Sequence, residues 1–513
     1  MTPDTTTGQR AGARAWAALA VLGVPAVLVM MNMSVLNLAL PSIGASLEPG
    51  SAQLLWIADS YGFAVAGLLV TMGALGDRFG HRRILLGGAA AFTCASLLAA
   101  FSHGPGMLIA ARVAQGIAAA ALAPSSLAVI RRLFTDPRQR TLAITIWMLA
   151  FLTGGAIGPL LGGLVLQHFW WGAVFLLSVP AMLVLVITGP ALLPRDHGSG
   201  AGRIDALSVA AGLACPVLLV AGVKILAADG GSPQAWGCAA VGAAAGVLFW
   251  KRQRILADPL IDTALFRSPG FTVTVTGMLL VGMVLFGTSL LSAQYLQLVL
   301  GHDPLTAGLW TLPSAVVGTA AALLATGLAA RWRPLTVMAL GTTTALAGPL
   351  LLGRADHEPW FVVGGSVLLF AGLTPYLALG TGIVLDAAPA EQAGAASAIS
   401  ETGGELGGAL GIALLGSISA AAYRADLTDR LPPGLAPDAA SRTLAGTLDR
   451  AAKLPPADNA TLTEAATTAF THSIHVHAGA VATIVALLAC ATWLMRARLK
   501  RAGLARRPAT THS

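Results

Sequence analysis

Among the ionisable residues that interrupt apolar runs long enough to cross a lipid bilayer, four could do chemistry: Asp59, Arg112, Glu401 and Glu405. A charge inside the hydrocarbon region is costly, so such residues usually bind a substrate or carry protons. Glu401 and Glu405 stand four residues apart and share one helix face. Two carboxylates this close in a low dielectric cannot both ionise cheaply, so one is suited to exchanging a proton. The alternative is that both are neutral packing groups and that Arg112 merely orients helices.

Asp59, Arg112 and the amide Asn32 lie at a similar predicted depth. Each stands 18 or 19 residues from the charged residue at the inner end of its run. At 1.5 Å per residue this distance is about 27 to 28 Å along a helix. We therefore expect the three side chains in the outer half of the membrane, while the spacing leaves their mutual contacts open.

The composition predicts that these side chains are held by membrane-spanning helices. The 513 residues are 56% hydrophobic and 11% charged, whereas soluble proteins average about 25% charged residues. Apolar runs long enough to cross about 30 Å of hydrocarbon predict an all-α polytopic protein with fourteen spans. Their predicted limits are 16–40, 54–76, 84–102, 106–130, 141–166, 172–193, 206–228, 235–250, 271–298, 307–330, 334–352, 360–387, 395–421 and 475–496.

The distribution of basic residues predicts the orientation. With fourteen spans, 23 of the 31 Lys and Arg residues fall on one side of the membrane, in short turns and at the two ends. Such an excess marks the cytoplasmic side, so both termini are predicted to be cytoplasmic. The segment 422–474 is then external, with an amphipathic helix expected near 439–454.

The same distribution argues against other partners. The net charge of +8 could suggest nucleic acid, but the arginines lie in turns between spans, so we expect the lipid bilayer as partner and no nucleic acid. The four cysteines fall inside apolar runs, which favours packing over disulfides or metal binding. His472, His475 and His477 lie close in sequence without indicating converging ligands. No metal and no cofactor are expected.

Two motifs predict moving parts. The stretch TMGALGDRFGHRRIL at 71–85 forms a short charged turn between two spans. Its glycines allow helix ends to approach closely, and Asp77 is placed to pair with an arginine or with a helix N-terminus. The candidate gating residues here are Gly73, Asp77, Arg78, Gly80 and Arg82.

The second motif is GGAIGPLLGG at 154–163. Glycines at every fourth position give a smooth helix face for tight packing of two bundles, and the proline imposes a bend. Its candidate gating residues are Gly154, Gly158, Pro159, Gly162 and Gly163.

Three further stretches complete a pattern: MNMSVLNLALP at 31–41, LIAARVAQGIAA at 108–119 and APAEQAGAASAISETGGELGGALG at 388–411. Together with the two motifs, they resemble the fourteen-helix drug:proton antiporter branch of the major facilitator superfamily. Within that branch the chain looks like exporters of quaternary ammonium compounds of the QacA and SmvA type. The resemblance spans about residues 16 to 497, without the external segment.

The resemblance implies two six-helix bundles that rock about a central site. The implied regions are a cytoplasmic tail at 1–15, a bundle at 16–193, a linker with two inserted helices at 194–250, a bundle at 251–497 that includes 422–474, and a basic cytoplasmic tail at 498–513. It also implies a monomer in the cell membrane that exchanges protons for lipophilic, cationic drugs. The 71–85 turn acts in that family as a cytoplasmic gate latch.

A site for lipophilic cations needs apolar walls, carboxylates and aromatic faces. Asp59, Glu401, Glu405 and Arg112 are the proton-coupling candidates. The substrate-binding candidates are Asn32, Trp56, Asp59, Tyr61, Trp147, Phe151, Gln294, Tyr295 and Trp310. The sequence departs from the family at Asn32, where an aspartate is common, so this position cannot carry a proton.

Three other functions compete with multidrug export. A dedicated exporter of one natural product would serve self-resistance with the same machinery. A polytopic membrane enzyme would need clustered catalytic side chains, and the predicted loops carry no such cluster of His or Asp. An ATP-driven pump would need a Gly-Lys phosphate loop, and no lysine follows a glycine anywhere in the chain.

Overall fold

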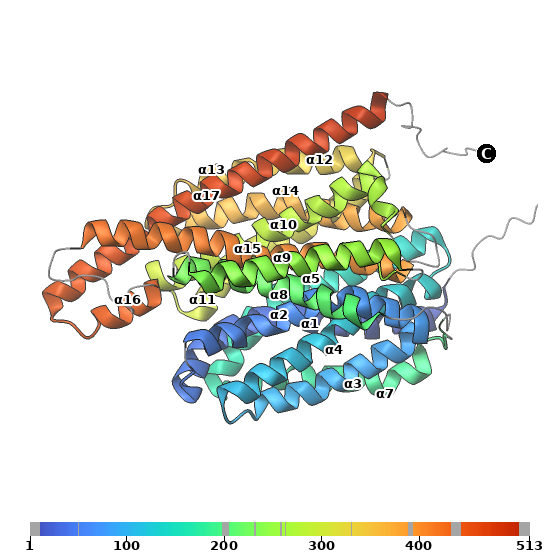
Figure 1. The fold of residues 1–513 in the computed structure, drawn as a ribbon, viewed down its shortest axis with the longest axis horizontal. Coiled ribbons are helices and arrows are strands. Elements are labelled where there is room, and N and C mark those ends of the chain that lie inside the picture. Colours follow the sequence, from blue (N-terminus) through green and yellow to red (C-terminus); the bar gives the residue numbers. More distant parts are fainter. Residues whose placement is uncertain are drawn as a thin grey trace, which may run out of the picture. The chain divides into compact units, whose positions relative to one another are not determined.

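The protein is built from helices. The computed structural model describes residues 11–49, 51–196, 198, 205–229, 232–256, 259–261, 263–329, 331–387, 393–431 and 443–501. Within these ranges it contains helices and turns and no β-strand (Figure 1). The predicted all-α class is therefore confirmed.

The helices fall in three groups along the chain. The first group is α1 (Ala13–Leu47), α2 (Ser51–Phe79), α3 (His81–Ala100), α4 (Pro105–Leu133), α5 (Pro137–His168), α6 (Ala173–Leu176) and α7 (Ser178–Leu192). The second is α8 (Ala206–Asp229) and α9 (Pro233–Ile255). The third is η1 (Leu265–Arg267), α10 (Pro269–Gln294), the π-helix η2 (Tyr295–Val299), α11 (Pro304–Ala329), α12 (Pro334–Ala345), α13 (Ala347–Leu352), α14 (Pro359–Asp386), α15 (Ala393–Arg430), α16 (Leu444–Ala451) and α17 (Pro456–Arg501).

Each predicted span coincides with one helix or with a pair of consecutive helices. Eleven helical segments of the described chain are long and apolar enough to cross a membrane. A twelfth is α5, in which Leu142–Gly155 and Leu160–His168 meet at an angle of 41°. This bend falls at the stretch that contains Pro159, as proline in a helix favours. The chain is thus a polytopic membrane protein, and the number fourteen remains a prediction.

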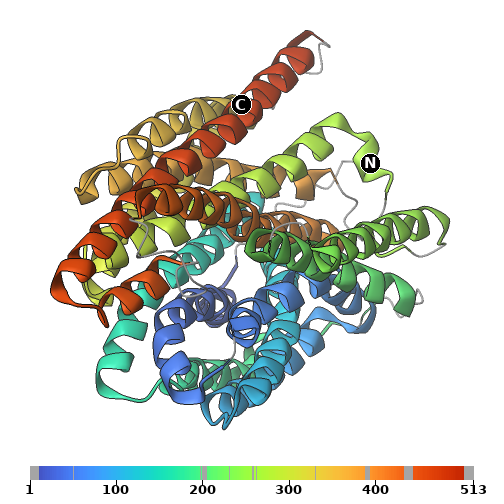
Figure 2. The same cartoon turned by 60° about the vertical axis from the view of Figure 1, so that its left-hand side comes forward.

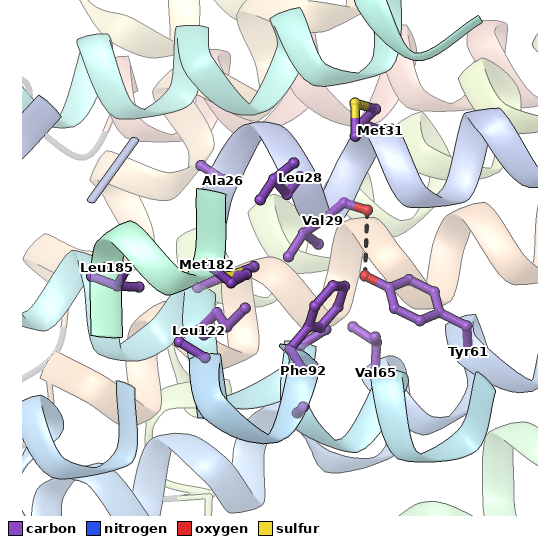
Figure 3. Packing of buried hydrophobic residues seen from close by; sticks show 14 of the residues in the cluster. Ala26, Leu28, Val29, Met31, Tyr61, Val65, Phe92, Leu122, Met182 and Leu185 are labelled. Atoms are coloured by element: carbon purple, nitrogen blue, oxygen red, sulfur yellow. Dashed lines mark hydrogen bonds between the residues drawn. The ribbon is translucent and has the colours of Figure 1, made fainter. Parts of the chain in front are cut away.

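The chain divides into two compact units. The first comprises Met1–Pro216, Ala245–Leu265 and Thr381–Thr402, and the second comprises Val217–Ala244, Phe266–Gly380 and Gly403–Ser513. In the first unit α1 packs along α5, while α2 and α3 pack on α4. Figure 3 shows part of the resulting core, including Val29, Phe92 and Leu122. Since lipid is as apolar as this core, close packing rather than burial from water stabilises it.

In the second unit α10 and α12 pack against α17, and α16 lies against α17 (Figures 1 and 2). Thr443 caps α16 by accepting a hydrogen bond from the Gly446 N–H at 3.2 Å, as Thr does at helix starts. The hydroxyls of Tyr423 and Thr447 lie 2.7 Å apart and join α15 to α16. The helix predicted near 439–454 is confirmed, with the shorter bounds 444–451.

The predicted limits of the last two spans are corrected. The sequence predicts that the first of them ends at 421 and that the second begins at 475. In the structure α15 runs on to Arg430 and α17 begins at Pro456. Polar residues extend these helices beyond their apolar cores. Arg430 pairs with Asp426, one helical turn earlier, at 2.5 Å, and pairs at this spacing support exposed helix. Most of the described part of 422–474 is therefore helical.

Candidate functional site

Arg112 is fully buried in α4, with 1% of its surface exposed. Its guanidinium donates from Nη1 to Asn32 Oδ1 on α1 and, at 3.3 Å, to Gln115 Oε1. Nε donates to the Ile57 carbonyl on α2 at 3.4 Å. The Tyr61 ring lies under the guanidinium at 4.6 Å, a cation–π contact that strengthens when water is excluded. Three helices of the first unit thus meet at one cation.

A chain of hydrogen bonds extends this cluster through the first unit. Gln115 Nε2 donates to Ser96 Oγ on α3 at 2.9 Å. The Ser96 and Ser178 hydroxyls lie 3.2 Å apart, and Ser178 donates to the Phe175 carbonyl at 2.8 Å. Polar groups in an apolar surrounding stabilise one arrangement when each has a partner. Gln115 and Ser96 therefore fix the Arg112 guanidinium in place.

The structure brings together two of the three residues predicted at one depth. Asn32 and Arg112 are in direct contact. Asp59 lies on α2, two residues after the Ile57 carbonyl that Arg112 binds, and its side chain lies outside the described part of the structure. Tyr61, a predicted substrate residue, is fully buried, with its ring against the Arg112 guanidinium. Its hydroxyl donates to the Val29 carbonyl (Figure 3).

The aromatic candidates of the first unit separate into buried and exposed groups. Trp147 and Phe151 on α5 stack with ring centroids 5.8 Å apart. They line a narrow pocket together with Pro25, Ala26, Val29, Leu122, Ala123 and Ser126. Trp56 is 41% exposed and packs edge-on to Phe63 at 6.1 Å. Trp147 and Phe151 are therefore better placed than the exposed Trp56 to line a substrate site in this unit.

The candidates of the second unit have structural partners. The buried Tyr295 begins the π-helix η2, and its hydroxyl donates to the Asp356 carbonyl. Gln294 is half-buried directly before it. Trp310 packs against the largely exposed Trp360, with ring centroids 4.7 Å apart. Tyr295 and Trp310 thus anchor loops and helix ends in the described structure.

The two carboxylates Glu401 and Glu405 lie on α15, where both side chains are half-buried. Of the three histidines of α17, His472 and His475 lie with ring centroids 6.3 Å apart. His475 Nε2 donates to the Ala355 carbonyl at 2.8 Å, and the buried His477 lies 3.0 Å from the Thr288 hydroxyl on α10. No metal-binding group of His, Cys, Asp or Glu was found among the described residues.

The charged turn between α2 and α3 is tightly folded. Gly80 adopts φ +96°, which disfavours any residue with a Cβ. Asp77 lies 2.9 Å from His81 Nε2, one helical turn further on. Arg78 stacks over the Phe79 ring at 5.1 Å, and Arg82 donates to the Pro190 carbonyl at 2.6 Å. Gly73 is buried in the last turns of α2.

A residue that the sequence did not reveal holds this turn. Asp196, beyond the end of α7, accepts the His81 N–H at 2.5 Å and the Arg82 N–H at 3.1 Å. Its carboxylate also lies 3.3 Å from Arg132 Nη1 at the end of α4. We expected Asp77 to pair with an arginine or to meet a helix N-terminus. In the structure Asp196 is an acid that meets the positive N-terminus of α3.

The glycine face of α5 packs against α1. A Cβ at Gly154 would overlap the Val27 carbonyl, and one at Gly162 would lie 2.9 Å from Val35. Gly158 and Gly163 are also buried, and the side chain of Pro159 lies outside the described part. We predicted that this face joins the two bundles, but the contacts described for it join two helices of one unit. The glycines carry no Cβ, which allows α5 to approach α1 this closely.

The same pattern recurs in the second unit. GGALG at 407–411 repeats the glycine spacing of GGAIG at 154–158. A Cβ at Gly407 or Gly411 would overlap the Leu279 or Met283 carbonyl on α10. Helix α15 therefore packs on α10 as α5 packs on α1. The repeat is visible in the sequence as the same glycine spacing, and it places Glu405 at the position of Leu152.

We expect Gly154→Ala to lower the thermal stability of the detergent-solubilised protein, because the new methyl group overlaps the Val27 carbonyl. Overpacking of this kind costs about 1–3 kcal/mol. Gly155→Ala is the matched control, since no described atom lies within 4 Å of a Cβ there. Equal unfolding temperatures for the two variants would contradict the tight contact between α1 and α5.

The second group of helices is joined by an ion pair at its polar end. Asp205, directly before α8, accepts from Arg252 Nε at 2.7 Å and from its Nη2 at 2.9 Å. The hydrogen bond from Arg252, followed by that from Ser208, holds the pKa of Asp205 well below its ordinary value. Such two-point pairs fix geometry as well as charge. The start of α8 and the end of α9 are thus held together.

Known proteins are similar in sequence to nearly the whole of this chain. The family model "Major Facilitator Superfamily" matches residues 23–412. The multidrug efflux pump LfrA of Mycolicibacterium smegmatis is 41% identical over 478 residues, covering 92% of this chain and 94% of that protein. The methyl viologen resistance protein SmvA of Salmonella typhimurium is 34% identical over 507 residues, covering 95% and 99%.

A solved structure supports the same fold. A bacterial homolog of the human lysosomal transporter Spinster, in an inward-facing and unoccupied conformation, has a TM-score of 0.62 at 17% identity, covering 94% of this chain and 98% of that one. This likeness concerns the fold, while the relatives by sequence are drug efflux and resistance proteins. The chain belongs to the major facilitator superfamily, as a multi-pass transporter of the cell membrane and not an enzyme.

Proposed function

We propose that this protein is a proton-coupled antiporter that exports lipophilic, cationic drugs by alternating access. The observation that carries the proposal is Arg112, a fully buried guanidinium in a spanning helix, fixed by Asn32, Gln115 and Tyr61. A buried charge inside the membrane is costly and usually functional. The relatives named for multidrug efflux and methyl viologen resistance support the substrate class.

The proposal assigns proton exchange to the membrane carboxylates Asp59, Glu401 and Glu405, with Arg112 as their positive counterpart in the first unit. A proton that crosses the membrane potential releases about 2.3 kcal/mol per 100 mV. Exchange of one proton for one monovalent cation moves no net charge and draws only on the pH gradient. Asn32 cannot take a proton, so the coupling depends on the three acids.

The remaining parts of the proposal concern organisation. The protein is a monomer with fourteen spans and cytoplasmic termini. The six-helix bundles at 16–193 and 251–497 rock about a central site, and the two inserted helices lie between them in the sequence. Trp147 and Phe151 form an aromatic wall for the substrate. The α2–α3 turn, with Asp77, Gly80 and Asp196, forms the cytoplasmic latch.

For the latch we expect Asp77→Asn to slow efflux about fivefold while drug binding stays unchanged. The reason is that the contact with His81 is weakened, and one hydrogen bond contributes about 1 kcal/mol. Rates are measured as drug efflux from loaded cells at equal protein level. Asp458→Asn, an exposed acid at the start of α17, is the control. Full efflux by the Asp77→Asn variant would mean that the turn only sets the membrane topology and does not act as a latch.

The proposed function is tested with inverted membrane vesicles. An imposed pH gradient, acidic inside, is expected to drive uptake of ethidium and tetraphenylphosphonium, while an imposed Na⁺ gradient drives none. Uptake driven only by Na⁺, or by neither gradient, would contradict proton coupling. If a panel of drugs yields one transported compound alone, a dedicated exporter replaces the multidrug proposal.

A further inference from the structure

The pocket between α1, α4 and α5 has one aromatic and one aliphatic side. The stacked rings of Trp147 and Phe151, inclined by 21°, form the first. The aliphatic side comes from α1 and α4, with Pro25, Ala26, Val29, Leu122 and Ala123. All of these residues belong to the first unit. The space between them is too narrow to admit a water molecule, so a ligand must part the walls to enter.

Two polar atoms of this pocket are buried without a hydrogen-bond partner in the described part of the chain. Ser126 is 0% exposed and Trp147 is 3% exposed. Among the described residues, neither Ser126 Oγ nor Trp147 Nε1 has a hydrogen-bond partner. Buried polar groups are nearly always paired, because leaving one unpaired is unfavourable. The exceptions therefore call for an explanation, and a ligand that pairs with both atoms is one.

The chemistry of the lining selects the ligand. An indole N–H only donates, while a serine hydroxyl both donates and accepts. Both groups suit a carbonyl or hydroxyl oxygen. Stacked aromatic side chains favour a flat ring system. Among the described residues the lining contains no charged side chain, so the indole N–H and the serine hydroxyl are its polar groups for a ligand.

We propose that this pocket is a subsite for the flat, oxygen-bearing aromatic part of a drug. Trp147 Nε1 and Ser126 Oγ bind a ring carbonyl or hydroxyl, and the Trp147–Phe151 stack holds the ring. This inference rests on the proposed export of drugs and adds a rule of selectivity. Planar aromatic compounds with ring oxygens bind these two polar atoms, whereas cations without a hydrogen-bond acceptor touch the rings alone and do not depend on Trp147 Nε1 or Ser126 Oγ.

The test compares two probes in equilibrium binding to purified protein in detergent. Daunorubicin has a flat ring system with carbonyl and hydroxyl oxygens, and tetraphenylphosphonium has a positive charge and no acceptor. Trp147→Phe removes the N–H and keeps an aromatic ring, and Ser126→Ala removes the hydroxyl. Each variant is expected to weaken daunorubicin binding about five- to tenfold and to change tetraphenylphosphonium binding less than about twofold. Trp236→Phe, at an exposed tryptophan on α9, is the control.

Three results of the binding test would each contradict the proposed subsite. Equal loss for both probes, no loss for either, or no daunorubicin binding by the unaltered protein would overturn the subsite. Because binding is measured without an ion gradient, the result does not depend on proton coupling. Failure of the pH gradient to drive transport would refute the proposed antiport and leave the binding result standing.

Discussion

Replacing Arg112 with glutamine is expected to reduce drug efflux about a hundredfold without removing the protein from the membrane. The substitution removes the charge, the contact with Asn32 and the cation–π contact with Tyr61. A hydrogen bond to a charged group contributes about 1.5–3 kcal/mol, and a desolvated cation–π contact about 2 kcal/mol. A net loss of about 3 kcal/mol corresponds to the hundredfold effect. Efflux is measured as loss of ethidium fluorescence from loaded cells.

Two further variants separate charge from geometry. Arg112→Lys keeps the charge but loses the planar fork that reaches Asn32, Gln115 and the Ile57 carbonyl together, so we expect an intermediate rate. Arg430→Gln, at a partly exposed arginine on α15, is the control and should leave efflux unchanged. Unaltered efflux by Arg112→Gln at normal protein level would remove this cluster from the mechanism.

The second large effect concerns Glu401 and Glu405. We expect either Glu401→Gln or Glu405→Gln, but not both equally, to abolish accumulation of drug driven by a pH gradient. Two carboxylates one turn apart on α15 cannot both stay ionised in a low dielectric, so one holds the exchangeable proton. That variant should still exchange labelled drug for unlabelled drug across the membrane, because this exchange needs no proton.

The measurement uses proteoliposomes, with drug accumulation and drug exchange followed in the same preparation. Asp59→Asn is compared alongside and should impair divalent cations before monovalent ones, since Asn32 has already removed one acid from that end. If all three amide variants accumulate drug as the unaltered protein does, these acids do not couple protons to transport.

Much of the fold could be read from the sequence because membrane helices have a simple physical signature. A run of apolar residues of the right length is enough, so every predicted span coincides with helix. The ends were less accurate where polar residues continue a helix outside the membrane, as between Arg424 and Arg430 in α15. Apolarity marks the membrane-spanning part, not the end of hydrogen bonding in the helix.

The site was partly predictable for a similar reason. Depth follows from residue count, so Asn32 and Arg112 were predicted at one level, and the structure joins them by a hydrogen bond that the count left open. Contacts depend on helix rotation and packing, which residue count does not give. Asp196 follows a polar linker, and its sequence carries no sign of the α3 N-terminus that it caps. Trp147 Nε1 and Ser126 Oγ, which have no hydrogen-bond partner among the described residues, likewise depend on how three helices meet.

The most direct test of proton:drug antiport is proton release from the purified protein in weakly buffered detergent. If drug binding displaces protons from the protein, adding tetraphenylphosphonium to saturation should acidify the solution in proportion to the protein present. Arg430→Gln should release protons in the same way. Saturating drug binding without any change in pH would contradict the proposed coupling.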